Sequence, residues 1–229
     1  MSTPLIITID GPAGAGKSTV AQKVATRLGL IYVDSGATYR AAALRVLQSG
    51  ISPDDEPAVA ELIAQTDIRI TTEGLQSRVL TDGEDVTEKI RTPEVTLAAA
   101  KVSRSSEVRA KLVAVQRNCA MGRGVVMEGR DIGTVVFPKA ALKVFLKAHP
   151  EERARRRLKQ DKKEGRSATL EQTAGEITRR DQLDAERKIS PLVPAADAYR
   201  IDSTDLVADQ VVEQILDLAR KENLIELRK

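Results

Sequence analysis

The sequence predicts an α/β fold whose core is a parallel sheet flanked by helices. Short aliphatic runs at 5–9, 124–127, 142–146 and 199–201 have the length and composition of buried parallel strands. Segments with helical periodicity separate them, at about 17–28, 37–49, 105–120, 151–163, 169–187 and 205–222. Asp205 or Thr204 is the expected cap of the last helix. Strands that alternate with helices in this way favour a doubly wound sheet.

One stretch of the chain breaks the alternation. Residues 67–71, 77–81 and 84–86 have strand-like patterns separated by Glu-Gly and Asp-Gly turn signals, which favours an antiparallel meander. The polar segment SPDDEP precedes the meander and Thr92-Pro93 follows it. We therefore expect an inserted lobe at 52–100, with 1–51 and 101–229 forming one core domain.

Composition excludes several classes of protein. The 229 residues are 41% hydrophobic and 30% charged, so the chain should fold into a globular core rather than remain disordered. Five aromatic residues and a net charge of +3 argue against a nucleic-acid partner. No apolar run approaches the ~18 residues that span a bilayer, and no secretory signal is recognisable, so we expect a cytoplasmic protein. The single cysteine, Cys119, predicts neither a disulfide nor a zinc site.

A glycine-rich loop follows the first predicted strand and precedes the first predicted helix. Residues 11–18 read GPAGAGKS and match the pattern GxxxxGK[ST] in full. Glycines let backbone amides curl around phosphate oxygens, and the helix N-terminus adds positive potential. Lys17 is then placed for the β and γ phosphates, and the Ser18 hydroxyl for a magnesium ion. The loop therefore predicts a site for a nucleoside triphosphate.

Two further segments indicate where a phosphate acceptor binds. DSGATYR (34–40) follows the second strand and offers a hydroxyl, a phenol and a guanidinium. MEGRDIGTVVFP (127–138) follows the third strand and offers Glu128, Arg130 and Asp131. Ligands of open α/β sheets bind in the crevice at the carboxyl ends of the strands. The sequence therefore predicts a phosphotransferase with both substrates at this edge of the sheet.

Together, the motifs GPAGAGKST, DSGATYR, IRTPEV, Val108-Arg109, GRDIGTVVFP, ERARRR and PLVPAADA resemble those of bacterial cytidylate kinases, nearly from end to end. The resemblance implies transfer of the γ-phosphoryl group of ATP to CMP or dCMP, a reaction of pyrimidine nucleotide metabolism. It also implies a P-loop core, an antiparallel inserted lobe that binds the nucleoside monophosphate, and Mg²⁺ with the ATP. CMP and dCMP are the expected partners, with no nucleic acid and no membrane, and a monomer is the default.

The resemblance assigns roles to individual residues. ATP binding falls to Gly11, Pro12, Ala13, Gly14, Ala15, Gly16, Lys17, Ser18 and Thr19, with Ser18 as the metal ligand. Acceptor binding falls to Ser35, Tyr39, Arg40, Arg109, Arg130, Asp131, Arg180, Asp184 and Arg187. Catalytic roles fall to Lys17, Arg130, Arg153, Arg157 and Arg187. The spacing of Arg180, Asp184 and Arg187 by itself favours a solvated helix face with ordinary ion pairs, and only the resemblance favours a ligand site.

An arginine-rich segment is expected to form a lid over about 148–166. Residues 151–166 hold eight basic residues, and Arg153, Arg156 and Arg157 match the family's lid over the triphosphate. Arginines that close on a P-loop stabilise the charge that builds on the transferred oxygens. A general base is not required, because the second pKa of a nucleoside monophosphate is about 6. His149, at the start of this segment, is expected to have a capping or surface role.

The sequence departs from the family pattern at two positions and leaves other functions open. Glu128 stands where the family usually has Asp, and Ala100 where it often has Ser near the base. Another small P-loop kinase, acting on UMP, AMP or a non-nucleotide such as shikimate, is the alternative enzyme. A nucleotide-gated switch that binds a macromolecule is the alternative without enzymatic turnover.

Overall fold

The computed structural model describes residues 4–163, 167–185, 187 and 189–226. It confirms the α/β prediction: in this part of the chain an eight-stranded sheet has the order β3-β4-β2-β6-β1-β7-β8, and β5 pairs with β4. The strands are β1 (Ile6–Asp10), β2 (Ile31–Asp34), β3 (Ile68–Glu73), β4 (Gln76–Thr81), β5 (Glu84–Asp85), β6 (Val125–Gly129), β7 (Leu142–Lys147) and β8 (Tyr199–Asp202). β1 lies between β6 and β7, and all three run parallel.

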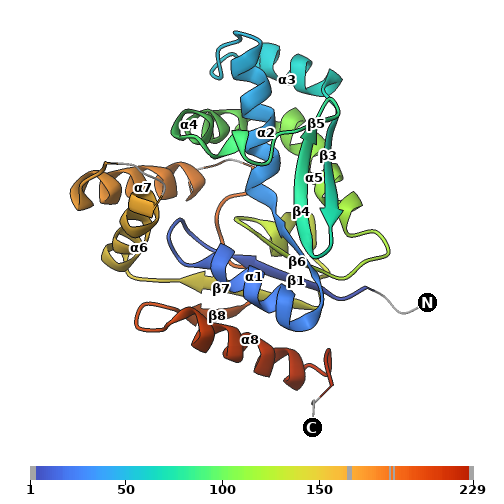
Figure 1. Ribbon diagram of the computed structural model, residues 1–229, viewed down its shortest axis with the longest axis vertical. Coiled ribbons are helices and arrows are strands. Elements are labelled where there is room, and N and C mark those ends of the chain that lie inside the picture. The colour runs from blue at the N-terminus through green and yellow to red at the C-terminus, as the bar shows by residue number, and fades with distance from the viewer. Residues whose placement is uncertain (1–3, 164–166, 186, 188, 227–229) are drawn as a thin grey trace.

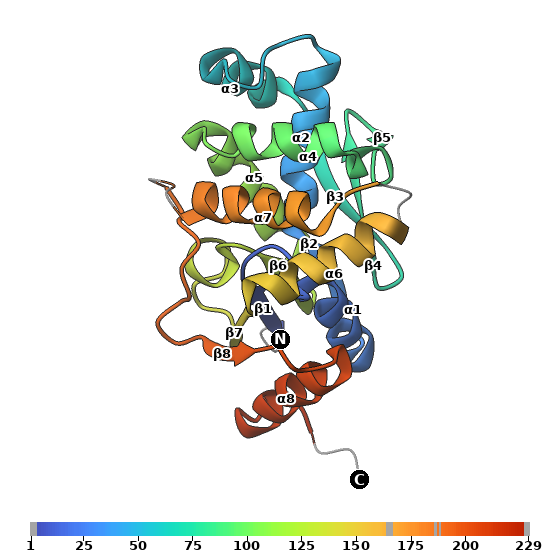
Figure 2. The same cartoon turned by 90° about the vertical axis from the view of Figure 1, so that its left-hand side faces the viewer.

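Helices surround this sheet (Figure 1). They are α1 (Lys17–Leu28), α2 (Ser35–Gln48), α3 (Glu56–Gln65), α4 (Pro93–Val102), α5 (Ser106–Cys119), α6 (Pro150–Lys163), α7 (Leu170–Ala185) and α8 (Ala208–Lys221). A 3₁₀ turn, η1 (Lys89–Arg91), and a π-helical turn, η2 (Ile132–Val136), complete the described elements. In Figures 1 and 2, α7 lies between α4 and α6 along the long axis of the molecule.

Aliphatic side chains form the core, as the scarcity of aromatic residues predicts. One cluster joins α1 and α8 to the sheet through residues such as Val20, Val24 and Ile215. A second cluster joins α2, α3 and α4 to the meander strands, through residues such as Val46 and Ile63. Burial of this apolar surface provides the main stabilisation of the fold. No helix in the described ranges is both long and apolar enough to cross a membrane.

The predicted antiparallel meander is confirmed, and it continues the central sheet. β3 and β4 pair antiparallel, from Ile68 opposite Thr81 to Glu73 opposite Gln76. β4 also meets the parallel strand β2, where Tyr32 lies opposite Gln76. The meander therefore forms one edge of the same sheet. The division into a core and an inserted lobe stays a prediction.

The structure adds one helix that was not predicted and corrects the start of another. The segment SPDDEP leads directly into helix α3, because the Asp55 side chain accepts from the Ala58 N–H at 3.2 Å and Pro57 occupies the first turn, where its missing N–H costs nothing. The last helix begins at Ala208, and neither predicted cap is used. Thr204 instead binds the Asp202 carboxylate and accepts from the His149 N–H, which keeps residues 203–206 in a loop.

Candidate active site

The glycine-rich loop adopts a conformation that only glycine allows at three points. Gly11, Gly14 and Gly16 have φ values of 150°, 75° and 91°. A Cβ on Gly11 would lie 2.1 Å from the Leu146 carbonyl oxygen, and one on Gly14 would lie 2.7 Å from that of Arg153. The loop therefore packs closely against the end of β7 and against α6. It joins β1 to the N-terminus of α1, as the phosphate-binding pattern requires.

Lys17 is buried beside this loop. Its Nζ donates to the Pro12 carbonyl oxygen at 2.9 Å, so the ammonium group lies under the backbone that would hold the phosphates. Burial and the nearby Arg130 lower the pKa of Lys17 to about 7, against the attraction of Glu128. A polyanionic ligand would favour the charged ammonium form and so bind strongly here. Ser18 and Thr19 follow on the exposed start of α1.

Glu128 is held by residues from two neighbouring segments. The Tyr32 hydroxyl of β2 donates to its Oε1 at 2.8 Å, and the carboxylate is 4% exposed. Burial and Asp34 raise the pKa of Glu128, while Lys17 and a hydrogen bond from Ser18 oppose that rise. The longer side chain at this position therefore still places its carboxylate between the P-loop and β2.

Residues 34–40 form the start of α2 at the same edge of the sheet. Arg40 donates to the Asp34 carboxylate at 2.7 Å. Burial alone would raise the pKa of Asp34, but Arg40 outweighs it and holds that pKa below its usual value. The Ser35 hydroxyl donates to the Glu128 carbonyl oxygen at 2.7 Å and is buried. Arg40 is thus an ion-paired, partly exposed cation, and the Ser35 hydroxyl already has a partner inside the protein.

Arg109 and Asp131 form a buried ion pair deeper in the same region. Their side chains are 4% and 7% exposed, and Arg109 NH2 donates to Asp131 Oδ2. The Arg109 guanidinium also lies over the Tyr39 ring, 5.3 Å from its centroid. Arg109 Nε is buried and has no hydrogen-bond partner among the described residues. These three predicted acceptor residues, from α2, α5 and the segment after β6, are therefore brought together.

Arg130 links the P-loop to helix α7. Its Nε donates to Asp184 Oδ2 at 2.8 Å, and its NH1 donates to the Gly11 carbonyl oxygen at 3.0 Å. Asp184 is 2% exposed and also receives a hydrogen bond from Arg187. Burial would raise the pKa of Asp184, but Arg130 and Arg187 together hold it below its usual value. Asp184 near the end of α7 and Arg187 just beyond it therefore point inward and do not form a solvated helix face.

Arg180 differs from these ion-paired arginines. It donates no hydrogen bond to any described residue, and burial with Arg130 nearby lowers its pKa to about 10. The charges that act on it come from Arg130, Asp184, Arg40 and Arg157. A buried cation surrounded mainly by other cations is costly unless an anion binds between them. The crevice is thus electrostatically suited to a phosphate group.

Two arginines of helix α6 are bound beside the P-loop, one to the loop itself and one to the segment after β8. Arg153 donates to the Ala13 carbonyl oxygen at 3.1 Å and pairs with Asp181 of α7, which accepts from the Ala13 N–H at 3.3 Å. Arg156 donates to the Ser203 hydroxyl at 3.0 Å and to the Ser203 carbonyl oxygen at 2.6 Å. In this structure both guanidinium groups are bound to protein atoms beside the loop.

Another arginine of the predicted lid is paired within α6. Arg157 pairs with Asp161 at 3.1 Å. Residues 164–166, the end of the predicted lid, lie outside the described residues, and so does Glu186 within the predicted helix 169–187. The lid itself stays a prediction. Burial raises the pKa of the Cys119 thiol to about 12.

Three further residues of this region, which were not predicted from the sequence, hold the site together. Asp10 ends β1, and its carboxylate accepts from the Ile132 and Gly133 N–H groups at 2.8 and 2.7 Å. Tyr32 holds Glu128, and Asp181 holds Ala13 and Arg153. Asp10 alone carried a signal, since it is a carboxylate at the end of an otherwise aliphatic strand, directly before Gly11.

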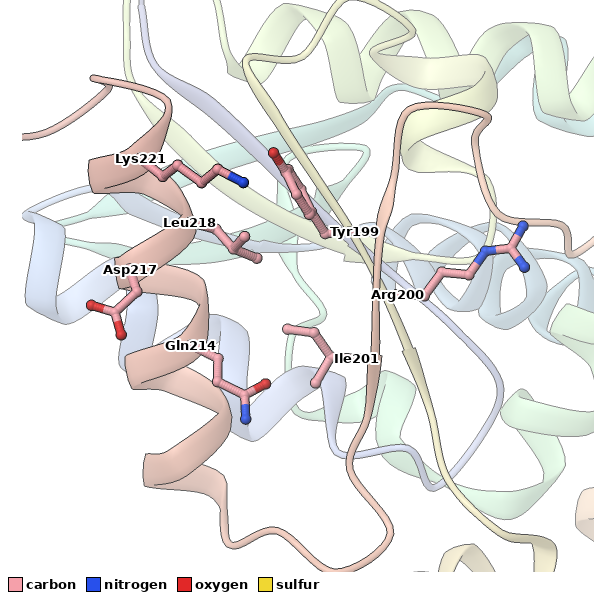
Figure 3. Close-up of a pocket in the computed structure, with 7 residues that line it drawn as sticks. All are labelled: Tyr199, Arg200, Ile201, Gln214, Asp217, Leu218 and Lys221. Carbon is pink, nitrogen blue, oxygen red and sulfur yellow. The ribbon is translucent and has the colours of Figure 1, made fainter.

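A pocket of about 360 Å³ lies elsewhere, between β8 and α8 (Figure 3). It is lined by Tyr199, Arg200, Ile201, Gln214, Asp217, Leu218 and Lys221. None of the predicted site residues lines it, and in Figure 3 the Arg200 side chain points away from α8. The candidate active site is instead the cluster of charged residues that joins the P-loop to α2 and α7.

Comparison with known proteins gives one consistent result. A family model described as cytidylate kinase matches residues 7–221. A protein named cytidylate kinase from Desulforamulus reducens is 52% identical over 215 residues, which cover 94% of this chain and 96% of that protein. One from Pelotomaculum thermopropionicum is 50% identical over 92% of this chain and 93% of its own. One from Caldicellulosiruptor bescii is 49% identical over 94% and 95%, respectively.

Proposed function

The chain belongs to the cytidylate kinase family, and we propose that its charged crevice transfers the γ-phosphoryl group of ATP to CMP and dCMP, giving CDP and dCDP. The chain covers nearly the full length of its relatives, so the family's enzymatic activity applies to the whole protein. The chain is thus an ATP:CMP phosphotransferase.

The observation that carries the assignment is the position of Arg130. Its guanidinium binds the Gly11 carbonyl oxygen on the donor side and Asp184 on the acceptor side. A cation between two phosphate sites can stabilise negative charge on both reacting groups at once. Arg180 and Arg40, on opposite walls, supply further positive charge for the acceptor phosphate.

The transfer step needs little covalent help from the protein. A phosphate oxygen of CMP attacks the γ phosphorus of ATP, a new P–O bond forms, and the bond from the γ phosphorus to the bridging oxygen breaks to release ADP. The attacking oxygen is largely ionised at neutral pH, since the second pKa of the phosphate is about 6. Lys17 and Arg130 would then hold the donor and acceptor in line, and positioning provides most of the rate enhancement.

The residues present fit a magnesium ion bound together with ATP. The Ser18 hydroxyl lies at the start of α1, and the Glu128 carboxylate hydrogen-bonds with it, so hard oxygen ligands are available. No group of three or more Asp, Glu, His or Cys side chains suited to a metal occurs in the described ranges. Mg²⁺ commonly needs only one or two protein ligands beside phosphate and water. When bound, the ion would neutralise charge on the phosphates, and Ser18 would hold it.

The acceptor base is assigned to the Arg109, Asp131 and Tyr39 cluster. Asp131 offers a carboxylate that can accept from the 4-amino group of cytosine, and Tyr39 offers the ring beside it. We assign residues 52–100, which hold α3, the meander and most of α4, to a lobe that closes on the monophosphate, and α6 to a lid. Both would exclude water from the transferring group.

A panel of acceptors tests the proposal. Formation of ADP is followed by a coupled assay with ATP, Mg²⁺ and, in turn, CMP, dCMP, UMP, AMP and shikimate. We expect the highest kcat/KM with CMP or dCMP. Equal or faster turnover with AMP or shikimate would refute the assigned substrate, and slow ATP hydrolysis unaffected by any acceptor would refute the kinase. Sedimentation of the same sample checks the expected monomer.

A further inference from the structure

A brace of hydrogen bonds joins the start of the P-loop to the acceptor segment. Asp10, the last residue of β1, is 5% exposed. Its Oδ1 accepts from the Ile132 N–H at 2.8 Å and its Oδ2 from the Gly133 N–H at 2.7 Å. One residue later, the Gly11 carbonyl oxygen accepts from Arg130 NH1 at 3.0 Å. Two consecutive residues, Asp10 and Gly11, thus accept hydrogen bonds from the segment that carries Arg130 and Asp131, on either side of Asp131.

The same segment also packs closely against the sheet at Gly133. A Cβ added to Gly133 would lie 3.0 Å from Thr8 Oγ1, 3.3 Å from Asp10 Oδ2 and 3.3 Å from Lys143 Cδ. Those three groups come from the neighbouring strands β1 and β7, so η2 packs closely on the sheet at Gly133 and a side chain there would push the two apart by a few tenths of an ångström. The distance from β1 to the Arg130 backbone is therefore fixed by the Asp10 carboxylate and by the absence of a side chain at 133.

A carboxylate is the group suited to this position. It presents two acceptor oxygens to two backbone donors, and hydrogen bonds to an ionised acceptor are stronger than neutral ones. An asparagine would keep the shape but turn one acceptor into a donor, which would face the Ile132 or Gly133 N–H without a partner. The brace would then open at one of its two bonds while the buried volume stayed the same.

We propose that Asp10 is a positioning residue that sets Arg130 and Asp131 at the correct distance from the P-loop for in-line transfer. The inference rests on the proposed function, since it concerns alignment of the two phosphates. Asp10 does not face either substrate: both of its oxygens are occupied by backbone N–H groups. Its effect should appear in the chemical step, because misplacement of a reacting group by about 1 Å can cost on the order of a hundredfold in rate.

The test combines two variants with a double-mutant cycle. Asp10→Asn removes one bond of the brace, and Gly133→Ala displaces the same segment while leaving the Asp10 carboxylate intact. Each should lower kcat with CMP about ten- to a hundredfold, with the KM for ATP within about threefold of the parent. In an Arg130→Lys background, Asp10→Asn should add less than about threefold, because the group it positions is already altered.

Lys111→Met is the matched control for loss of stability. Lys111 Nζ donates to the Ile63, Ala64 and Thr66 carbonyl oxygens at 2.7, 2.8 and 2.6 Å, at the end of α3 and away from Arg130. Its loss should lower the melting temperature with kcat unchanged. A shared fall in kcat for all destabilised variants would overturn the proposal.

The proposal would also be overturned if kcat of both variants stayed within twofold of the parent, or if the effects of Asp10→Asn and Arg130→Lys were fully additive. It would equally be overturned if neither variant folded, since Asp10 would then be a residue of the fold alone. The parent enzyme separates this inference from the proposed function. Absence of CMP-dependent ADP formation by the parent would refute the function, whereas an active parent with unaffected variants refutes only the role of Asp10.

Discussion

Replacement of Asp131 by asparagine should change which base the enzyme prefers. Asp131 lies in a buried pair with Arg109, with side chains 7% and 4% exposed, so a base that reaches it meets a desolvated carboxylate. Cytosine presents an amino donor at position 4, which this carboxylate can accept. Uracil presents a carbonyl oxygen there, and two buried acceptors would face each other.

The magnitude follows from the cost of an unmatched buried polar group. That cost is about 1–3 kcal/mol, so the parent should favour CMP over UMP by roughly ten- to a hundredfold in kcat/KM from this contact. Asp131→Asn turns one acceptor into a donor and should reduce that preference to within about threefold, mainly by loss of activity on CMP. The same change weakens the ion pair with Arg109, whose Nε has no hydrogen-bond partner in the described part of the chain. It should therefore lower the free energy of unfolding by about 1–3 kcal/mol.

The assay compares kcat/KM for CMP and UMP in the parent and in Asp131→Asn, at a temperature where both are folded. Arg40→Met is the control, because Arg40 is assigned to the phosphate that both acceptors share, and its loss should lower both values equally. An equal fall for CMP and UMP in Asp131→Asn would refute the reasoning. It would mean that Asp131 acts through Arg109 or the adjoining Arg130 and that the base is selected elsewhere.

Other predictions follow from the same contacts. Lys17→Ala should abolish phosphoryl transfer with the circular-dichroism spectrum unchanged, and turnover within tenfold of the parent would contradict the role of the lysine. The segments 52–100 and 148–166 should approach each other when a bisubstrate analogue binds, seen as a smaller radius of gyration in solution scattering; an unchanged profile would count against closure. Burial raises the pKa of Asp10 from 3.8 to about 6, so its proton stabilises the folded state below pH 4 and that contribution is lost by pH 6. The free energy of unfolding of the parent should therefore fall by about 3 kcal/mol between pH 4 and 7 from this group, and that of Asp10→Asn should not. Urea unfolding of both proteins at each pH measures the difference. Lys111→Met should cost about 1–3 kcal/mol, because three carbonyl oxygens at the end of α3 lose their donor.

Much of the fold could be predicted because its signals are local. The predicted bounds of α1, 17–28, agree with the structure, and those of α2, α5, α6 and α7 differ by one or two residues. The helices α1, α2, α5 and α7 have apolar positions at helical spacing, whereas α6 was predicted from its run of helix-forming, mostly charged residues. The P-loop was equally local, since its glycines, lysine and serine lie within eight consecutive residues. Helix α3 was missed because the Asp and Pro residues that begin a helix also form turns.

The partners of the charged residues could not be predicted in the same way. Tyr32 and Glu128 are 96 positions apart, and Ala13 and Asp181 are 168 apart. They meet because β6 lies between β1 and β2, and because α7 returns across the P-loop. Neither strand order nor helix docking is encoded in the period of a single segment. Spacing alone also favoured solvent for the face with Arg180 and Asp184, which the structure turns inward.

The sequence by itself predicted a site for a nucleoside triphosphate, because the residues of the P-loop pattern lie within eight consecutive positions. Only the tertiary structure decided what each charged group binds. Arg153, which is predicted to lie over the triphosphate, is bound to Ala13 of the P-loop and to Asp181, while Asp10, which had no predicted role, holds the acceptor segment. The physical reason is that a buried charge takes whatever partner the packing of distant strands and helices brings within about 3 Å, and that packing is set by the whole core.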